Sequence, residues 1–167
     1  MTTVEASGSA PPAFRVLVID NRPDRRELMR HVVAATGLAT PDVAEAGSVA
    51  EATALLDGGD RDVVVVEIQL PVPLGLETIA ALRSHAPGVR IVVCSFHRDE
   101  ATKEQARAEG ADAYLDKPVS SRSLQDVLRG FASETPSDSP QRRGRPGPGV
   151  DGSDGCVGRG RSRRSTT

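Results

Sequence analysis

Short runs of aliphatic residues alternate along this chain with longer segments in which apolar residues recur every three or four positions. Four runs are typical of strands, at residues 14–19, 62–68, 91–94 and 113–115. They are almost continuously apolar, as expected for strands of a parallel sheet that is covered on both faces. A fifth and weaker strand is predicted at 40–44.

The segments between the strands have the apolar spacing of helices. Pro23 suits a first helical turn, Ser48 suits an N-cap, and Gly37 suits a helix end. The predicted helices begin at Pro23 and end at Gly37, begin after Ser48 and end at Gly58, include Leu76 and end before Pro87, span 102–109, and span 121–131. Alternating strands and helices predict right-handed βαβ units, which make a three-layer α/β fold with helices on both faces of a parallel sheet.

Composition divides the chain into three parts. Residues 132–167 include 17 Gly, Pro or Ser among 36, and 7 Arg against 4 acidic residues. So little apolar surface cannot offset the entropy of ordering a backbone, so we expect a disordered, mildly basic tail there. Residues 1–13 are predicted to be a short disordered lead, and 14–131 a single domain. Aromatic residues make up only 2% of the chain, so its core must be aliphatic.

Several classes of protein are excluded by what the chain lacks. No apolar run approaches the roughly 20 residues of a membrane span, and the first residues do not have the pattern of a signal peptide. Cys94 and Cys156 lie far apart in different contexts, which fits neither a disulfide framework nor a metal site. Cys94 is expected to be a buried, unreactive residue within a strand. The chain is therefore predicted to be cytoplasmic.

Polar side chains follow four of the five predicted strands. Asp20 and Asn21 follow the first, Glu67 ends the third, Ser95 follows the fourth and Lys117 follows the fifth. Because open parallel sheets bind their ligands at the carboxyl ends of the strands, these side chains are expected to share one pocket.

Four motifs at these strand ends resemble the receiver domain of bacterial response regulators. They are VIDN at 18–21, VEIQLP at 66–71 with Gly75, VCS at 93–95 and AYLDKP at 113–118. The resemblance covers nearly all of residues 14–131 and implies a flavodoxin-like sheet in the order 2-1-3-4-5. It also implies a non-enzymatic signalling module that takes a phosphoryl group from a histidine kinase.

The resemblance assigns a role to each pocket residue. Asp20 occupies the first of two acidic positions that bind Mg²⁺, and Lys117 the position that contacts the phosphoryl oxygens. Ser95 and Tyr114 occupy the two switch positions, where an aromatic ring turns inward when the hydroxyl moves toward the phosphate. Two positions depart from the family pattern: the second acidic position is Asn21, and the phosphoryl acceptor is Glu67.

Both departures act against phosphorylation. Asn21 keeps an oxygen but loses a negative charge, so a Mg²⁺ ion held by Asp20, Asn21 and Glu67 would be weakly bound. Glu67 is one methylene longer than aspartate, which moves its carboxylate by about 1.5 Å. An error of 1 Å costs in-line chemistry on the order of 10²-fold.

Three hypotheses for the pocket follow. Glu67 would mimic the phosphorylated state by pairing with Lys117 and accepting a hydrogen bond from Ser95. Alternatively, its ion pair with Lys117 fixes one inactive shape. In the third, the receiver is still phosphorylated at Glu67 with Mg²⁺. The first two predict a stand-alone receiver that signals by protein contact, without phosphorylation.

The expected partners are proteins, either a histidine kinase or an output protein. The last helix–strand–helix face, which includes 113–131, is a candidate surface for these partners or for a homodimer. The tail offers an alternative role, because Arg143 and Arg145 lie in an RRGRP segment that resembles the core of an AT-hook. Such guanidinium groups can enter a narrow minor groove, so a DNA-associated regulator is a further hypothesis.

Overall fold

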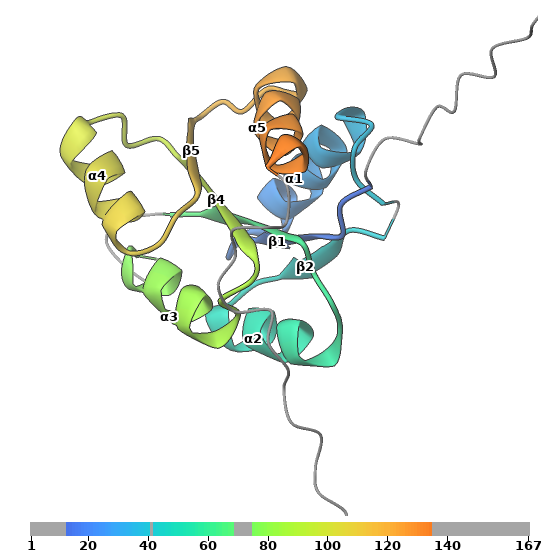
Figure 1. Ribbon diagram of the computed structural model, residues 1–167, viewed down its shortest axis with the longest axis horizontal. Helices are drawn as coiled ribbons and strands as arrows, with labels where there is room; N and C mark the ends of the chain where they lie inside the picture. The colour runs from blue at the N-terminus through green and yellow to red at the C-terminus, as the bar shows by residue number, and fades with distance from the viewer. Residues whose placement is uncertain (1–12, 41, 69–74, 135–167) are drawn as a thin grey trace, which may run out of the picture.

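Five parallel strands form one sheet at the centre of the molecule (Figure 1). The computed structural model describes residues 13–40, 42–68 and 75–134. The strands are β1 (Val16–Ile19), β2 (Ala44–Ala46), β3 (Val63–Glu67), β4 (Arg90–Ser95) and β5 (Ala113–Asp116). Their order is β2-β1-β3-β4-β5, and every neighbouring pair is parallel. The predicted three-layer α/β fold and its sheet order are confirmed.

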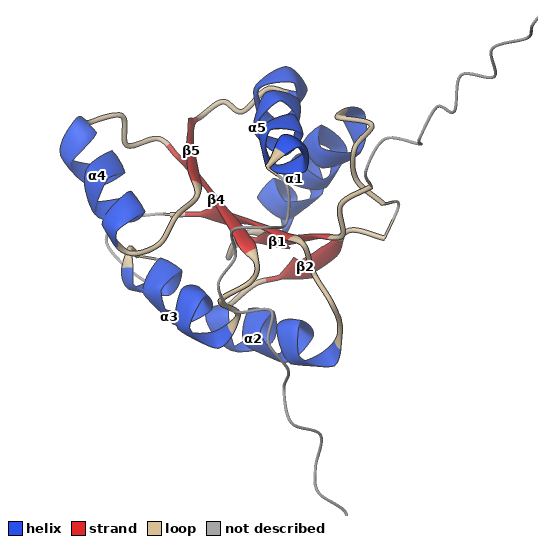
Figure 2. Ribbon diagram, viewed as in Figure 1, coloured by secondary structure: helices blue, strands red, loops and turns tan. Residues whose placement is uncertain are grey.

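Helices cover both faces of this sheet (Figure 2). They are α1 (Pro23–Ala35), α2 (Val49–Gly58), α3 (Glu77–His85), α4 (Glu100–Ala108) and α5 (Ser121–Ser133). Helices α1 and α5 lie on one face, and α2, α3 and α4 lie on the other.

Every strand except β2 contributes to two hydrophobic cores, because its side chains alternate between the two faces. In β1, Val16 and Val18 pack toward α1 and α5, whereas Leu17 and Ile19 pack toward α2 and α3. All five residues of β3 are buried, since this strand lies in the middle of the sheet. Cys94 is fully buried in β4, and this burial raises the pKa of its thiol to about 12.

Most predicted helix ends are confirmed by their local geometry. Pro23 stands at the first position of α1, and Gly37 follows the helix with φ of +68°, a conformation that glycine adopts without strain. The Ser48 hydroxyl caps α2 by accepting a hydrogen bond from the Glu51 amide at 3.2 Å.

The predicted position of the second strand was wrong. It was expected at 40–44, but β2 begins at Ala44, where its pairing with Leu17 starts. Ala39 instead forms an isolated bridge with Phe14, and the next residue, Thr40, donates an amide hydrogen bond of 2.9 Å to the Phe14 carbonyl. The strand itself reads Ala-Glu-Ala and lacks β-branched residues, so pairing with β1 specifies it rather than its own propensity.

Two helices are longer than predicted. Helix α4 begins at Glu100 rather than Thr102, because the Asp99 carboxylate caps it by accepting a hydrogen bond of 2.9 Å from the Thr102 amide. Helix α5 continues to Ser133, two residues past the expected domain boundary at 131.

Other predictions fall on residues that the structure does not describe. These are the lead up to residue 12, the expected break at 71–73, and the tail from residue 135 with Arg143 and Arg145. Within the described ranges, the helices are too short and too polar to cross a lipid bilayer.

Candidate phosphoacceptor pocket

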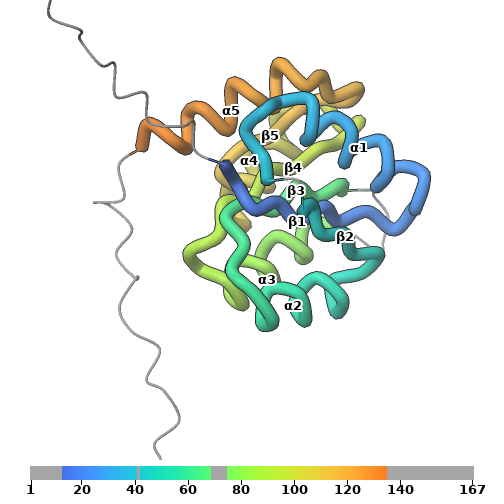
Figure 3. Tube along the Cα trace, turned by 90° about the vertical axis from the view of Figure 1, so that its right-hand side faces the viewer, coloured from blue at the N-terminus to red at the C-terminus, as the bar shows by residue number. Residues whose placement is uncertain are grey.

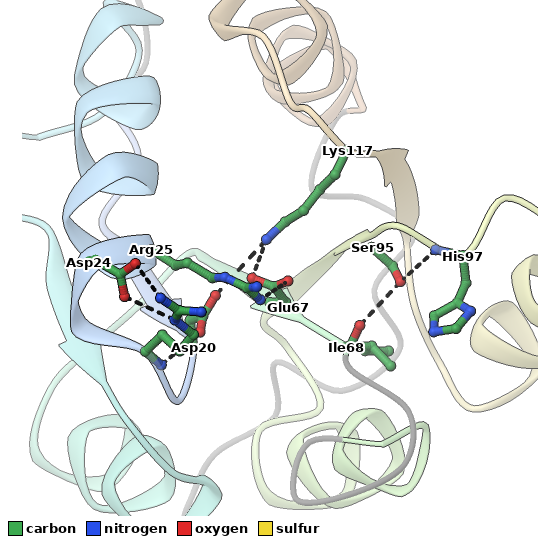
Figure 4. A network of polar contacts seen from close by, with 9 residues as sticks. Asp20, Asp24, Arg25, Glu67, Ile68, Ser95, His97 and Lys117 are labelled. Atoms are coloured by element: carbon green, nitrogen blue, oxygen red, sulfur yellow. Dashed lines mark hydrogen bonds and ion pairs between the residues drawn. The ribbon is translucent and has the colours of Figure 1, made fainter.

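The carboxyl ends of the strands meet at one edge of the sheet, where the turn between β1 and α1 begins. Figure 3 shows this turn at the opposite end of the molecule from the last turn of α5. The edge brings Asp20, Glu67 and Lys117 together from three separate strand ends (Figure 4). All three residues are buried. Asn21, which also follows β1, is exposed.

Glu67 is held by two cations, one on each carboxylate oxygen. Its Oε2 forms an ion pair with Lys117 Nζ, and its Oε1 accepts a hydrogen bond of 2.9 Å from Arg25 Nη1. Burial by itself raises the pKa of the Glu67 carboxyl, but its hydrogen bonds with Asp20 and Lys117 and the two positive charges lower it overall. Glu67 is therefore ionised at neutral pH.

Asp20 has the opposite electrostatic character. Burial, together with the neighbouring Glu67 carboxylate, raises the pKa of Asp20 to about 7. Its Oδ1 accepts a hydrogen bond of 2.8 Å from the Arg22 amide, and its Oδ2 lies 4.0 Å from Lys117 Nζ. Near neutral pH, Asp20 is thus only partly ionised.

The backbone of His97 connects the two switch positions. The His97 amide donates a hydrogen bond of 3.1 Å to the Ser95 hydroxyl, and the Tyr114 hydroxyl donates one of 2.6 Å to the His97 carbonyl. Burial raises the pKa of the Tyr114 phenol. Ser95 and Tyr114 are therefore tied to the same residue of the loop between β4 and α4.

The expected hydrogen bond from Ser95 to Glu67 is not the one that forms. The Ser95 hydroxyl donates instead to the Ile68 carbonyl at 3.1 Å, as Figure 4 shows. This carbonyl is close because β3 and β4 are neighbours, with the Ile68 amide donating to the Cys94 carbonyl. The expected ion pair between Glu67 and Lys117 is present.

Arg25 was missed by the sequence interpretation. It stands in the first turn of α1, close to the strand ends, and its side chain is about one-quarter exposed (27%). The helix dipole disfavours a cation in a first turn, so an arginine there was a signal that it has a partner elsewhere in the fold. The hydrogen bonds of the His97 backbone could not be predicted in this way, because a backbone amide and carbonyl are present in almost every residue type.

The residues of this pocket do not fit a Mg²⁺ ion. Mg²⁺ prefers charged oxygen ligands in a strict octahedral arrangement. Here Asn21 replaces one carboxylate, Asp20 is partly protonated, and both oxygens of Glu67 already hold cations. In the parts of the chain that the structure describes, no three His, Cys, Asp or Glu residues are grouped to hold a metal ion.

A groove of about 310 Å³ opens beside the pocket. Arg25 and Lys117 line it, together with apolar residues of α1, of the loop between β4 and α4, and of the segment after β5: Leu28, Met29, Val32, Phe96, Pro118 and Val119. Among the described residues, Leu28 and Phe96 are the large hydrophobic side chains that stay exposed. The Phe96 ring centroid also lies 5.5 Å from Lys117 Nζ.

The family of this chain is decided by a match of residues 16–129 to the model of the response regulator receiver domain. The chain belongs to that family. This receiver is 28% identical over 116 residues to the chemotaxis protein CheY of Halobacterium salinarum, a match that covers 70% of this chain and 94% of CheY. Receivers are signalling modules of two-component systems.

Solved structures agree with the assignment. The signal receiver domain of the putative response regulator NarL from Mycobacterium tuberculosis superposes with a TM-score of 0.64 at 27% identity, covering 74% of this receiver and 99% of that chain. The fold also matches the receiver domain of yeast Ssk1, solved with the histidine phosphotransfer protein Ypd1 (TM-score 0.60, 20% identity, 72% and 89% covered). The receiver spans about half the length of two transcriptional regulatory proteins among its curated relatives, TcrA of Mycobacterium tuberculosis and SphR of Synechococcus elongatus.

Proposed function

We propose that this receiver is a cytoplasmic two-component signalling module that acts by protein contact, without being phosphorylated. The ion pairs of Glu67 carry the proposal. A glutamate occupies the acceptor position, and its carboxylate is already neutralised by Lys117 and Arg25. The cation that would contact a phosphoryl group is thus engaged by a side chain of the receiver itself.

The position of Ser95 favours a fixed shape over mimicry of the phosphorylated state. In a mimic, the switch hydroxyl would turn toward the carboxylate that replaces the phosphoryl group. Ser95 instead donates to the backbone carbonyl of Ile68, the residue that directly follows β3. We therefore infer that Glu67 holds the receiver in one conformation that partners read directly.

Protein partners are supported by the exposed apolar surface beside the pocket. Leu28 and Phe96 line one groove, although large hydrophobic side chains are otherwise covered in the described part of the chain. Exposed apolar side chains that gather at one place are typical of contact surfaces. We propose that a histidine kinase, a phosphotransfer protein or an output protein of the pathway binds at this end of the receiver. The last helix–strand–helix face, formed by α4, β5 and α5, remains the candidate surface for a homodimer.

The proposal is tested by treating the full chain with acetyl phosphate and Mg²⁺ and measuring its intact mass. We expect no gain of a phosphoryl group. The matched control is the double variant Asn21→Asp, Glu67→Asp, which restores the acidic pattern of the family and should be phosphorylated under the same conditions. A phosphoryl adduct that peptide mapping places on Glu67 of the wild type would overturn the proposal.

A further inference from the structure

Two carboxylates and two cations meet in the pocket. Asp20 and Glu67 are the buried acids, and Arg25 and Lys117 are the cations that form ion pairs with their carboxylates. Each oxygen of Glu67 has its own cation, Arg25 on Oε1 and Lys117 on Oε2. We propose that the Arg25 guanidinium is the resident cation of the pocket and takes the place of the divalent metal that the receiver fold implies.

Charge balance supports this assignment. A divalent ion is stable in an acidic pocket because it neutralises more than one carboxylate at once. Here the positive charges of Arg25 and Lys117 already match the negative charges that Asp20 and Glu67 can carry. A Mg²⁺ ion would add two further positive charges at short distance from both cations, and repulsion inside a buried site is strong.

The way Arg25 is held also suits a permanent cation. Its backbone lies in the first turn of α1, which Pro23 begins, and its guanidinium reaches a carboxylate that is only about 3% exposed. Guanidinium remains charged at any pH at which proteins fold, and it hydrogen-bonds carboxylates in a planar geometry. Unlike a metal, this cation cannot be removed by a chelator. The inference rests on the proposed function, since it explains how the carboxylates of the pocket are neutralised in a receiver that is not phosphorylated.

The test measures binding of Mg²⁺ to the full chain in the absence of any phosphodonor. Isothermal titration calorimetry with MgCl₂ is combined with melting curves in about 10 mM MgCl₂, a concentration that would raise the folding equilibrium constant about tenfold for a site with a Kd near 1 mM. The wild type should show no saturable binding and no shift in Tm. Arg25→Gln should gain saturable binding, at least about tenfold tighter than any binding that the wild type shows.

Arg22→Gln is the matched control. Its side chain pairs with Asp24, at 2.8 Å, rather than with Glu67, yet it removes the same charge from the same turn. It should behave as the wild type does. An equal gain of Mg²⁺ binding in Arg22→Gln would show a general charge effect and overturn the proposal.

A second background keeps the test decisive if Asn21 and Glu67 alone prevent metal binding. In the Asn21→Asp, Glu67→Asp variant, adding Arg25→Gln should again tighten Mg²⁺ binding at least about tenfold. Tight Mg²⁺ binding by the wild type, or no effect of Arg25→Gln in either background, would overturn the inference. Phosphoryl uptake is scored separately by mass, so a phosphoryl adduct on Glu67 without metal binding would refute the proposed function alone.

Discussion

Asp20 and Glu67 lie in the same pocket yet differ in protonation. Glu67 has two cationic partners at hydrogen-bond distance, whereas Asp20 is 4.0 Å from Lys117 and its side chain is only about 5% exposed. The pKa of Asp20 is raised to about 7, so between about pH 4 and about 7 the folded chain keeps a proton that the unfolded chain has released. Raising the pH through this range therefore lowers the free energy of unfolding.

Asp20→Asn removes the loss of stability that accompanies ionisation of the Asp20 carboxyl. Each pKa unit corresponds to about 1.4 kcal/mol, so we expect the stabilisation by Asp20→Asn to be at least about 1 kcal/mol larger at pH 8 than at pH 5. Urea unfolding at the two pH values measures it. Asp24→Asn is the control. The hydrogen bond with Arg22 lowers the pKa of the Asp24 carboxyl, so this group does not change its protonation between pH 5 and pH 8. Equal stabilisation at both pH values would contradict the assignment.

At this scale the sequence predicted the ion pair of Glu67 with Lys117, but neither the role of Arg25 nor the partner of Ser95. The ion pair was predictable because both residues stand at the carboxyl ends of strands, β3 and β5, that flank β4 in the sheet. The direction of the Ser95 hydroxyl depends on where the Ile68 carbonyl lies, and no residue type encodes that. Arg25 acts across 42 positions of sequence, so only the packing of α1 on the sheet brings it to Glu67.

At the scale of elements, some boundaries are set by local sequence signals and others by pairing with a distant strand. Helices were predicted well where a cap or a breaker marks the end, as at Pro23, Gly37 and Ser48. Strand β2 was misplaced because nothing in its own three residues favours a strand, and its pairing with β1 fixes it. Boundaries that rest on pairing with a distant segment could not be found from the local pattern.

The cap of α2 gives a prediction at this scale. The Ser48 hydroxyl accepts from the Glu51 amide, and the Glu51 carboxylate accepts a hydrogen bond of 2.7 Å from the Gly47 amide. Ser48→Ala removes the first of these bonds and should cost about 1 kcal/mol of stability. Ser48→Asn keeps a capping oxygen and should cost far less. Chemical denaturation of the two variants measures the difference, and equal losses would show that the cap is not the cause.

At the scale of the whole molecule, the described residues of both hydrophobic cores lie between Phe14 and Phe131. Both hydrophobic cores are built from strands and helices between β1 and α5. The basic segment from residue 135 onward, with the candidate DNA-contacting residues Arg143 and Arg145, lies outside the described residues.

A chain that ends at Glu134 should therefore melt within about 2 °C of the full chain, which corresponds to less than about 0.5 kcal/mol for a domain of this size. Differential scanning calorimetry of the two proteins provides the comparison. A gel shift with DNA at increasing salt tests the other hypothesis for the tail, which predicts binding by the full chain and its loss in the shortened one. A large drop in Tm on shortening would mean that the tail belongs to the folded domain.

The two cations on Glu67 have a consequence for how a cell would use this molecule. A phosphorylated regulator returns to rest when its acyl phosphate hydrolyses, but a carboxylate that belongs to the chain is never lost. On the proposed mechanism every copy therefore delivers the same output from the moment it folds. The size of the response would then depend on how many copies are present, so synthesis and degradation of the protein set it rather than the activity of a kinase.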